Sequence, residues 1–356
     1  MTNKQWQTLL AVIRGERVMP LPAAFIIDSP WLPNWAGMTI LDYYASEERW
    51  LQANLKAIQT FPDCLFLPGF WSEFGMCTEP SAFGAKCLFY ENEFPFAEKV
   101  IHSVEDIDGL AQPDPRRDGL LPFVIKRLRD CQPQIEAAGH RIRFAISRGP
   151  LNIASFLMGP TEFLTEMKIT PEKIHQLLRL ITNFVSDWLA YQRECFPTID
   201  GVLMLDDIVG FIGEADFKEF AQPYLKELFT RLDVSVRAFH NDSPCKASAP
   251  HLVDTGINLF NMGIDVALKE LQDWTGGQVA LMGNIPPRDV LAAGTAKDVE
   301  TAVEEQVSSL ADTRRILFSC GGGMPPDVPS ENVEAFIVKL KDVSAPESRP
   351  PRRSSA

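Results

Sequence analysis

The chain has 356 residues, of which 46% are hydrophobic, and its formal net charge is −13 at pH 7. This length and apolar content suffice for one large barrel domain or two smaller domains, and the negative charge argues against nucleic acid or an anionic membrane surface as the main partner. No run of about 18 or more apolar residues occurs, and the seven cysteines are odd in number and scattered, unlike a disulfide framework. We therefore expect a cytoplasmic protein.

Short apolar runs alternate with helical patterns along the whole chain. The first segment, 1–16, has apolar residues at helical spacing and no signal-peptide pattern, so it predicts an amphipathic N-terminal helix. Strands are predicted at 21–28, 63–68, 141–147, 201–207, 235–240, 257–263, 279–284 and 315–320, with helical segments such as 171–195 and 298–312 between them. Eight nearly continuous apolar strands separated by helices predict a (β/α)8 barrel. A doubly wound open sheet is the alternative, but no GxGxxG follows any strand.

Residues 69–140 interrupt this rhythm between the second and third strands. They are rich in Phe, Pro and acidic residues, and we expect a long insertion over the mouth of the barrel. The final segment, 344–356, is rich in Pro, Ser and Arg and is predicted to be a disordered tail. The expected domain organisation is therefore a single barrel at 1–343 followed by this tail.

Polar residues stand at the carboxyl ends of the predicted strands, where the active sites of such barrels lie. His240 ends the fifth strand, Asp242 follows on the same side of an extended backbone, and Cys320 ends the eighth strand. Three ligands and an open position are typical of a catalytic zinc site. The plainer interpretation is that Cys320 is a small core residue and that residues 240–242 are an ordinary turn. Cys245 is a less favoured substitute ligand.

Other strand ends carry acidic side chains and an arginine that could pair with one of them. Glu73, Asp206 and Asp207 are candidate catalytic groups that could protonate a leaving oxygen or orient a metal ligand. Arg148 could hold a substrate carboxylate through its guanidinium, or it could pair with Asp206 as a structural contact.

Aromatic and amide side chains complete the candidate site. Trp31, Phe70 and Trp71 could line a pocket for a flat apolar substrate, or they could pack the insertion onto the barrel. Asn261 and Asn284 end the sixth and seventh strands and are further candidates for substrate binding.

The chain resembles the uroporphyrinogen decarboxylase superfamily from RGERVMPLP to the glycine-rich turn SCGGG, and within it the cobamide-dependent methyltransferase branch. That resemblance implies a (β/α)8 barrel whose zinc is held by a His-x-Cys pair and a distant cysteine, which His240 and Cys320 match. Two departures are visible: Asp242 stands where the pair has its cysteine, and the region IIDSPWLPNWAG lacks the arginine with which the decarboxylases hold porphyrinogen carboxylates.

The resemblance implies a zinc-dependent methyltransferase that works with a separate corrinoid protein, since the chain has no Asp-x-His-x-x-Gly motif of its own. A carboxylate in place of a thiolate makes the ligand set harder and favours an oxygen ligand, so transfer from a methoxy compound to cob(I)alamin is the preferred direction. Transfer from methylcobalamin to a thiol or a folate, a decarboxylase-like lyase, and a non-catalytic barrel that binds a corrinoid or tetrapyrrole remain as alternatives. We expect neither a nucleic-acid nor a membrane partner, and a homodimer is compatible with the sequence.

Overall fold

The computed structural model describes residues 1–344, and all eight predicted strands are present in it. The strands are β1 (Ala24–Ile26), β2 (Leu65–Leu67), β5 (Phe144–Arg148), β6 (Gly201–Leu205), β7 (Val236–Asn241), β8 (Leu259–Met262), β9 (Ala280–Ile285) and β10 (Ile316–Cys320). Six of them form a parallel sheet in the order β10-β9-β8-β7-β6-β5, and β1 pairs with β2 in parallel. A parallel bridge between Ala23 and Phe318 joins β1 to β10. Within the described residues, β2 and β5 are not paired with each other. The order of the other strands is nevertheless that of a (β/α)8 barrel.

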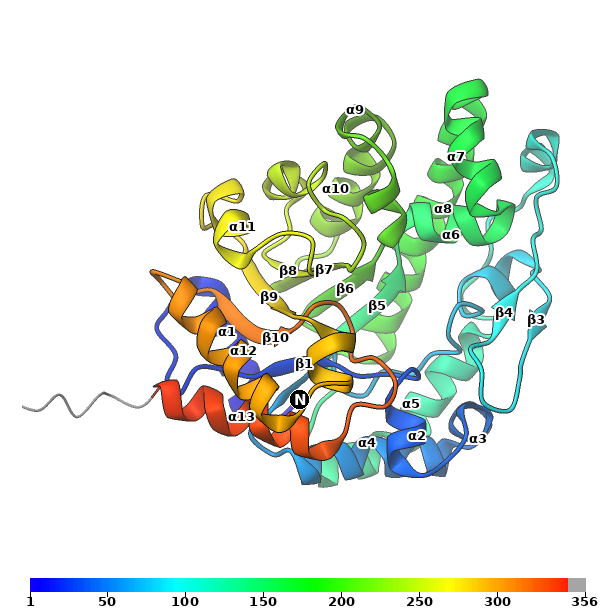
Figure 1. Ribbon diagram of the computed structural model, residues 1–356. Coiled ribbons are helices and arrows are strands. Elements are labelled where there is room, and N and C mark those ends of the chain that lie inside the picture. Colours follow the sequence, from blue (N-terminus) through cyan, green and yellow to red (C-terminus); the bar gives the residue numbers. More distant parts are fainter. Residues whose placement is uncertain (345–356) are drawn as a thin grey trace, which may run out of the picture.

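Helices surround these strands on the outside (Figure 1). They are α1 (Asn3–Arg14), α2 (Leu32–Ala36), α3 (Ile40–Ala45), α4 (Glu47–Thr60), α5 (Leu121–Ala137), α6 (Pro150–Met158), α7 (Pro160–Ile169), α8 (Pro171–Cys195), α9 (Glu214–Asp216), α10 (Gln222–Arg231), α11 (Leu268–Trp274), α12 (Ala296–Ser309) and α13 (Ser330–Ser344). The predicted helix at 171–195 coincides with α8, and the one at 298–312 is shifted by two or three residues relative to α12. None of the helices in the described part of the chain is long and apolar enough to span a membrane.

The strands carry two separate apolar faces, as strands covered on both sides must. One face points into the barrel, where residues such as Leu203, Ala238 and Leu317 form a core with α1. The other face points to the helices, where Met204, Phe239 and neighbouring side chains form the larger core. Trp6 of α1 packs edge-on against Phe144 at the start of β5, so α1 covers the end of the barrel opposite the candidate site. Side-chain parity along each strand therefore decides which polar residues can reach the mouth.

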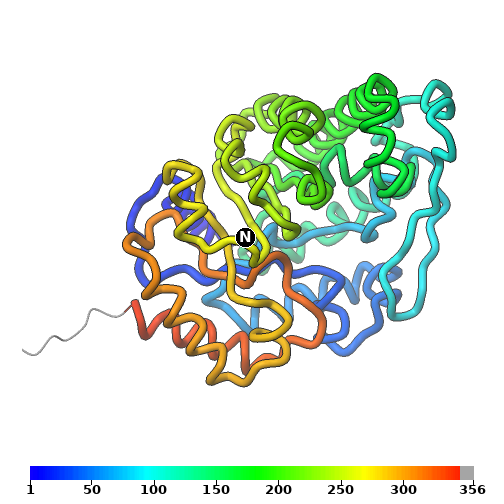
Figure 2. The backbone as a smooth tube through the Cα atoms, turned by 45° about the horizontal axis from the view of Figure 1, so that its top comes forward, coloured from blue at the N-terminus to red at the C-terminus, as the bar shows by residue number. Residues whose placement is uncertain are grey.

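The insertion after β2 consists of several short elements. After residue 69 come a 3-10 helix (Pro80–Phe83), a two-stranded hairpin of β3 (Cys87–Leu88) and β4 (Phe96–Ala97), and a second 3-10 helix (Val104–Gly109). The hairpin lies at one edge of the molecule in both views (Figures 1 and 2). Residues 121–137 of the predicted insertion are in fact α5, which takes the place of the helix that follows β2 in the barrel. The predicted tail, 344–356, lies outside the described residues except for Ser344, the last residue of α13.

Candidate active site

A group of three side chains at the mouth of the barrel could hold a metal ion. Asp207, His240 and Asp242 each offer one ligand atom, and these atoms lie within 4.8 Å of one another. His240 Nε2 is 3.7 Å from Asp207 Oδ1 and 4.0 Å from Asp242 Oδ2. The Asp242 N–H donates to Asp207 Oδ1 over 3.2 Å, which ties the loop after β7 to the loop after β6. His240 and Asp242 thus meet as predicted, and Asp207 joins them as a third candidate ligand.

The orientation of His240 is set by Asn261 of the neighbouring strand. Asn261 Nδ2 donates to the carbonyl of Met282 over 2.8 Å, so Asn261 Oδ1 faces His240 Nδ1 at 2.6 Å as an acceptor. His240 Nδ1 must therefore carry a hydrogen, and Nε2 is directed at the two carboxylates. In a metal-ligating histidine, one ring nitrogen usually binds the metal while the N–H of the other donates to a neighbouring oxygen. Asn261 therefore binds His240. It is not free for the substrate-binding role that the sequence predicted for it.

The electrostatics of the group also favour a cation. Removal from water raises the pKa of Asp242, with Asp207 adding to the effect and His240 opposing it. Carboxylates crowded together in this way are stabilised when a positive charge lies between them. One imidazole nitrogen and two carboxylate oxygens are suitable ligands for a divalent ion such as zinc and leave a position open for substrate.

Cys320 is not part of this group, contrary to the prediction from its place at a strand end. Its thiol belongs to the core between strands and helices, beside Cys64, because residue 317 points into the barrel and residue 320 has the opposite parity. Burial raises the pKa of Cys320 to about 12, so its thiol stays protonated. Cys245 is also buried outside the group, with its thiol 3.7 Å from Asp265 Oδ1.

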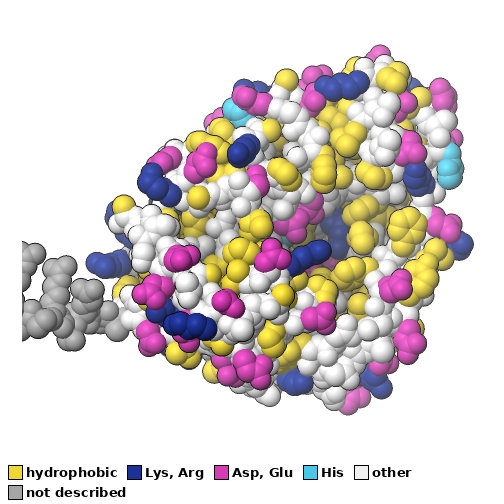
Figure 3. All heavy atoms as spheres, viewed as in Figure 1, with side chains coloured by type: hydrophobic (Ala, Val, Ile, Leu, Met, Phe, Trp, Pro, Cys, Tyr) yellow, Lys and Arg dark blue, Asp and Glu magenta, His cyan; other side chains and the backbone are white. Residues whose placement is uncertain are grey.

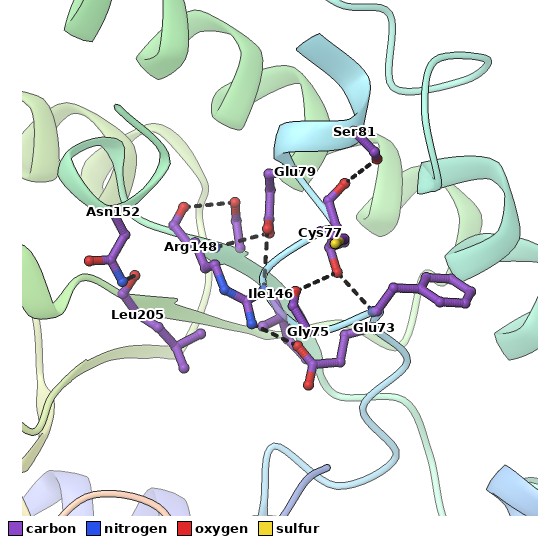
Figure 4. Close-up of polar contacts among 12 residues, drawn as sticks. Glu73, Gly75, Cys77, Glu79, Ser81, Ile146, Arg148, Asn152 and Leu205 are labelled. Atoms are coloured by element: carbon purple, nitrogen blue, oxygen red, sulfur yellow. Dashed lines mark hydrogen bonds and ion pairs between the residues drawn. The ribbon is translucent and has the colours of Figure 1, made fainter. Parts of the chain in front are cut away.

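Arg148, at the end of β5, is held between two buried glutamates of the insertion (Figure 4). Arg148 Nη2 lies 3.0 Å from Glu73 Oε2, and Arg148 Nη1 lies 3.3 Å from Glu79 Oε2. The backbone N–H of Arg148 also donates to Glu79 Oε1 over 3.0 Å. Both the expected pairing with Asp206 and a free guanidinium for a substrate carboxylate are therefore absent among the described residues, because Arg148 already binds Glu73 and Glu79.

Glu73 and Asp28 form the acidic part of the mouth. Burial raises the pKa of Glu73 against the opposing effect of Arg148, and Glu73 Oε1 is buried without a hydrogen-bond partner among the described residues. Desolvation raises the pKa of Asp28 well above its usual value, and the nearby carboxylates of Glu73 and Asp242 add to this rise. Asp28 is therefore near enough to Glu73, Arg148 and Asp242 to feel the charge of each. A buried carboxyl with a raised pKa can donate a proton near neutral pH.

Asp206 has a structural position that the sequence did not indicate. It is fully buried and accepts hydrogen bonds from the backbone N–H groups of Leu151 and Asn152, both 2.9 Å long. These N–H groups belong to the first turn of α6, whose donors have no partner within the helix. Asp206 points to the helix side of β6 and not into the mouth, so the expected catalytic role does not fit its placement.

The aromatic residues are part of the core, in line with the second of the two interpretations given for them. Trp31 is buried and donates through Nε1 to the carbonyl of Val328 over 2.9 Å. Phe70 and Trp71 are buried as well, and the carbonyl of Trp71 accepts from Trp50 Nε1.

Asn284 does not face the candidate metal group either. Its amide donates to the carbonyls of Gly263 and Val266 over 3.1 and 2.7 Å and thus stabilises the loop after β8.

Two functional candidates were missed at the sequence level. Glu79 lies in a turn-rich stretch with no periodic pattern, and only the tertiary contact with Arg148 distinguishes it from a surface acid. Asn152 donates to Asp207 Oδ2 over 3.3 Å and accepts from the N–H of Ile208, so it positions the loop that carries Asp207. The only sequence signal for Asn152 was its place just after the predicted third strand.

The surface of the molecule is hollowed on one face. Figure 3 shows a depression on one face of the molecule, with Lys or Arg and Asp or Glu side chains inside it and hydrophobic side chains around its edge. A charged floor with an apolar rim is typical of a small-molecule site.

The model of the family described as uroporphyrinogen decarboxylase (URO-D) matches residues 4–343. The chain belongs to the uroporphyrinogen decarboxylase family. It is 25% identical over 282 residues to a uroporphyrinogen decarboxylase from Psychromonas ingrahamii, an alignment that covers 76% of this chain and 77% of the relative. A second relative of that name, from Chloroherpeton thalassium, is 26% identical over 276 residues, with 74% of this chain and 76% of the relative covered.

Solved structures support the fold. A methyltransferase from Methanosarcina mazei superposes with a TM-score of 0.80 at 18% identity and covers 96% of this chain and 99% of its own. A B12-independent methionine synthase from a Shewanella species superposes with a TM-score of 0.59 at 11% identity and covers 92% and 97% of the two chains. At these identities the likeness concerns the fold alone, and it supports the predicted barrel architecture.

Proposed function

We propose that this member of the family is a zinc-dependent methyltransferase that removes the methyl group of a small methoxy compound and passes it to cob(I)alamin on a separate corrinoid protein. The observation that carries the proposal is the group of Asp207, His240 and Asp242, in which His240 Nε2 faces two carboxylates while Asn261 holds Nδ1. A bound divalent ion would polarise the ether oxygen of the substrate.

The ligand set supports an ether in preference to a thiol substrate. With Cys320 outside the group, the three candidate ligands are one nitrogen and two oxygens and include no thiolate. Such a hard set suits an oxygen ligand, whereas an electron-rich thiolate set suits a thiol.

The acids of the mouth would serve the departing oxygen. Glu73 has a raised pKa and an unpaired Oε1, so it can hold a proton until negative charge develops on the leaving oxygen. Glu79 and Arg148 would keep Glu73 in place, since Arg148 is anchored to Glu79 through both its backbone and its side chain. Asn261 and Asn152 would orient His240 and Asp207 respectively.

Charge weighs against decarboxylation of a porphyrinogen, the activity that the curated relatives are named for. Porphyrinogen carboxylates need cationic partners, but Arg148, the arginine at the end of β5, is already paired with Glu73 and Glu79.

Metal analysis combined with a cob(I)alamin methylation assay tests the proposal. The purified protein should bind about one zinc per chain and should methylate cob(I)alamin from methoxy aromatics in preference to methylamines and methyl thiols. The His240→Ala variant should lose both properties, whereas His102→Ala, an exposed histidine outside the site, should keep them. A protein without bound metal, or one that transfers methyl groups only from methylcobalamin to a thiol, would contradict the proposal.

A further inference from the structure

A cavity of about 320 Å³ opens beside the candidate metal group, between the loops that follow β7, β8, β9 and β10. It is lined by Asp242, Gly263, Ile264, Pro286, Pro287, Arg288, Asp289 and Gly321. This volume lies at the lower end of the ~300–1,000 Å³ that is usual for small-molecule sites, so it suits a small substrate and not a tetrapyrrole.

The lining of this cavity combines charged and apolar residues. The candidate metal ligand Asp242 and the cation Arg288 both line it. Ile264, which is 55% exposed, and two consecutive prolines provide apolar surface in the same lining. Gly263 and Gly321 also line the cavity and add no side chains to it. An added Cβ at Gly321 would lie 2.6 Å from a methyl carbon of Ile264, so this glycine packs closely against Ile264.

Arg288 is the cation of this region that is available to a ligand. Arg148 is buried between Glu73 and Glu79, whereas Arg288 is exposed and takes part in no ion pair within residues 1–344. Asp289 also lines the cavity, but the structure forms no ion pair between it and Arg288. A guanidinium with free N–H groups at the edge of an apolar cavity binds carboxylates with two parallel hydrogen bonds.

We infer that the substrate is a methoxylated carboxylic acid whose carboxylate is bound by Arg288 while its methoxy group lies at the candidate metal group. The inference rests on the proposed function and specifies its substrate class. The acidic mouth does not rule out an anionic substrate, because a divalent ion at Asp207, His240 and Asp242 offsets two of the nearby negative charges. Arg288 then decides which end of the substrate faces away from the metal.

Equilibrium binding separates this inference from the methyl transfer itself. The zinc-loaded protein should bind 4-methoxybenzoate about three- to tenfold more tightly than the neutral 4-methoxybenzamide, the range expected for a partly exposed guanidinium–carboxylate pair. Arg288→Gln should remove this preference, and Arg288→Lys should keep part of it. Arg17→Gln, which changes an exposed arginine near α1 at the other end of the barrel, should leave the preference unchanged.

A charge reversal sharpens the test. In Arg288→Glu the preference should invert, so that 4-methoxybenzylamine binds more tightly than 4-methoxybenzoate. The inference is overturned if wild-type protein binds the amine or the amide as well as the acid, if it binds none of the three, or if Arg288→Gln keeps the preference for the acid. A second pair of outcomes separates the two proposals. If the protein binds carboxylates through Arg288 but does not methylate cob(I)alamin, the proposed function is contradicted. If it methylates cob(I)alamin from neutral ethers without a charge preference, only this inference is overturned.

Discussion

Single side chains at the mouth have roles that depend on their partners more than on their own chemistry. His240 is a ligand candidate because Asn261 fixes its hydrogen on Nδ1, and Arg148 is unavailable to substrate because Glu73 and Glu79 bind it. Side chains along β10 alternate between the barrel interior and the surrounding helices. Cys320 is on the helix side of this alternation, so its thiol lies in the helix-facing core.

Because alternate side chains of β10 face opposite sides, substitutions at His240 and Cys320 should affect zinc binding differently. We expect His240→Ala to abolish zinc binding, because the variant removes the one nitrogen of the candidate group. Cys320→Ser should keep the zinc content of the wild type, since its thiol lies in a separate core. Metal analysis of both purified variants checks this, and loss of zinc in Cys320→Ser would restore that cysteine as a ligand.

Asn261 allows a second test at this scale. Asn261→Ala should weaken zinc binding by about 10- to 100-fold, because His240 loses the oxygen that sets its ring orientation and protonation. Competition with a chromophoric chelator measures the affinity. Asn258→Ala, which changes an asparagine at the opposite end of the barrel, is the matched control, and equal affinities in the two variants would show that Asn261 has no such role.

Glu73 is predicted to act on the chemical step. Glu73→Gln should slow single-turnover demethylation of a methoxy substrate by about 100-fold or more, while substrate affinity changes little, because proton donation to the leaving oxygen matters mainly in the transition state. Glu98→Gln, at an exposed glutamate of the same insertion, should react at the wild-type rate. An unchanged chemical step in Glu73→Gln would remove this residue from the mechanism.

At the scale of elements, loops and helix ends are joined by buried polar contacts that cross between strands. Asp206 of the loop after β6 binds the first turn of α6, and Asn152 of α6 returns to the loop that carries Asp207. The helix and the loop are therefore positioned as one unit. We therefore expect Asp206 to support the candidate site through α6 and not to contact substrate.

Asp206→Ala should accordingly lower the free energy of unfolding by about 2 kcal/mol, because two buried backbone donors of α6 lose their acceptor. Guanidinium denaturation measures this change. Asp254→Ala, at an exposed aspartate, should stay within about 0.5 kcal/mol of the wild type. A stable but inactive Asp206→Ala variant would instead favour the catalytic role.

At the scale of the whole molecule, the insertion after β2 supplies both buried acids and an exposed apolar edge. Glu73 and Glu79 reach into the mouth, whereas Phe89, Tyr90, Phe94 and Phe96 of the β3–β4 hairpin are between 37% and 54% exposed. An exposed apolar edge is suited to contact with another protein, and we propose the corrinoid protein as that partner.

Binding of the corrinoid protein should therefore change the dynamics of this insertion. We expect amide hydrogen exchange in residues 69–100 to slow when the corrinoid protein is added, while exchange in α8 stays the same. Protection that appears only outside the insertion would locate the partner on another surface.

The sequence by itself determined the barrel and the meeting of His240 and Asp242 at its mouth. Eight apolar strands alternate with helices, and this local pattern is visible without any tertiary contact, as is the place of His240 and Asp242 at a strand end. Only the tertiary structure decided which of the polar residues share a site, because the direction of a side chain depends on strand parity and on its partners across the fold. Asp207 entered the candidate metal group and Cys320 left it for this reason, and Glu79 became a partner of Arg148 through a contact between segments that are 69 residues apart.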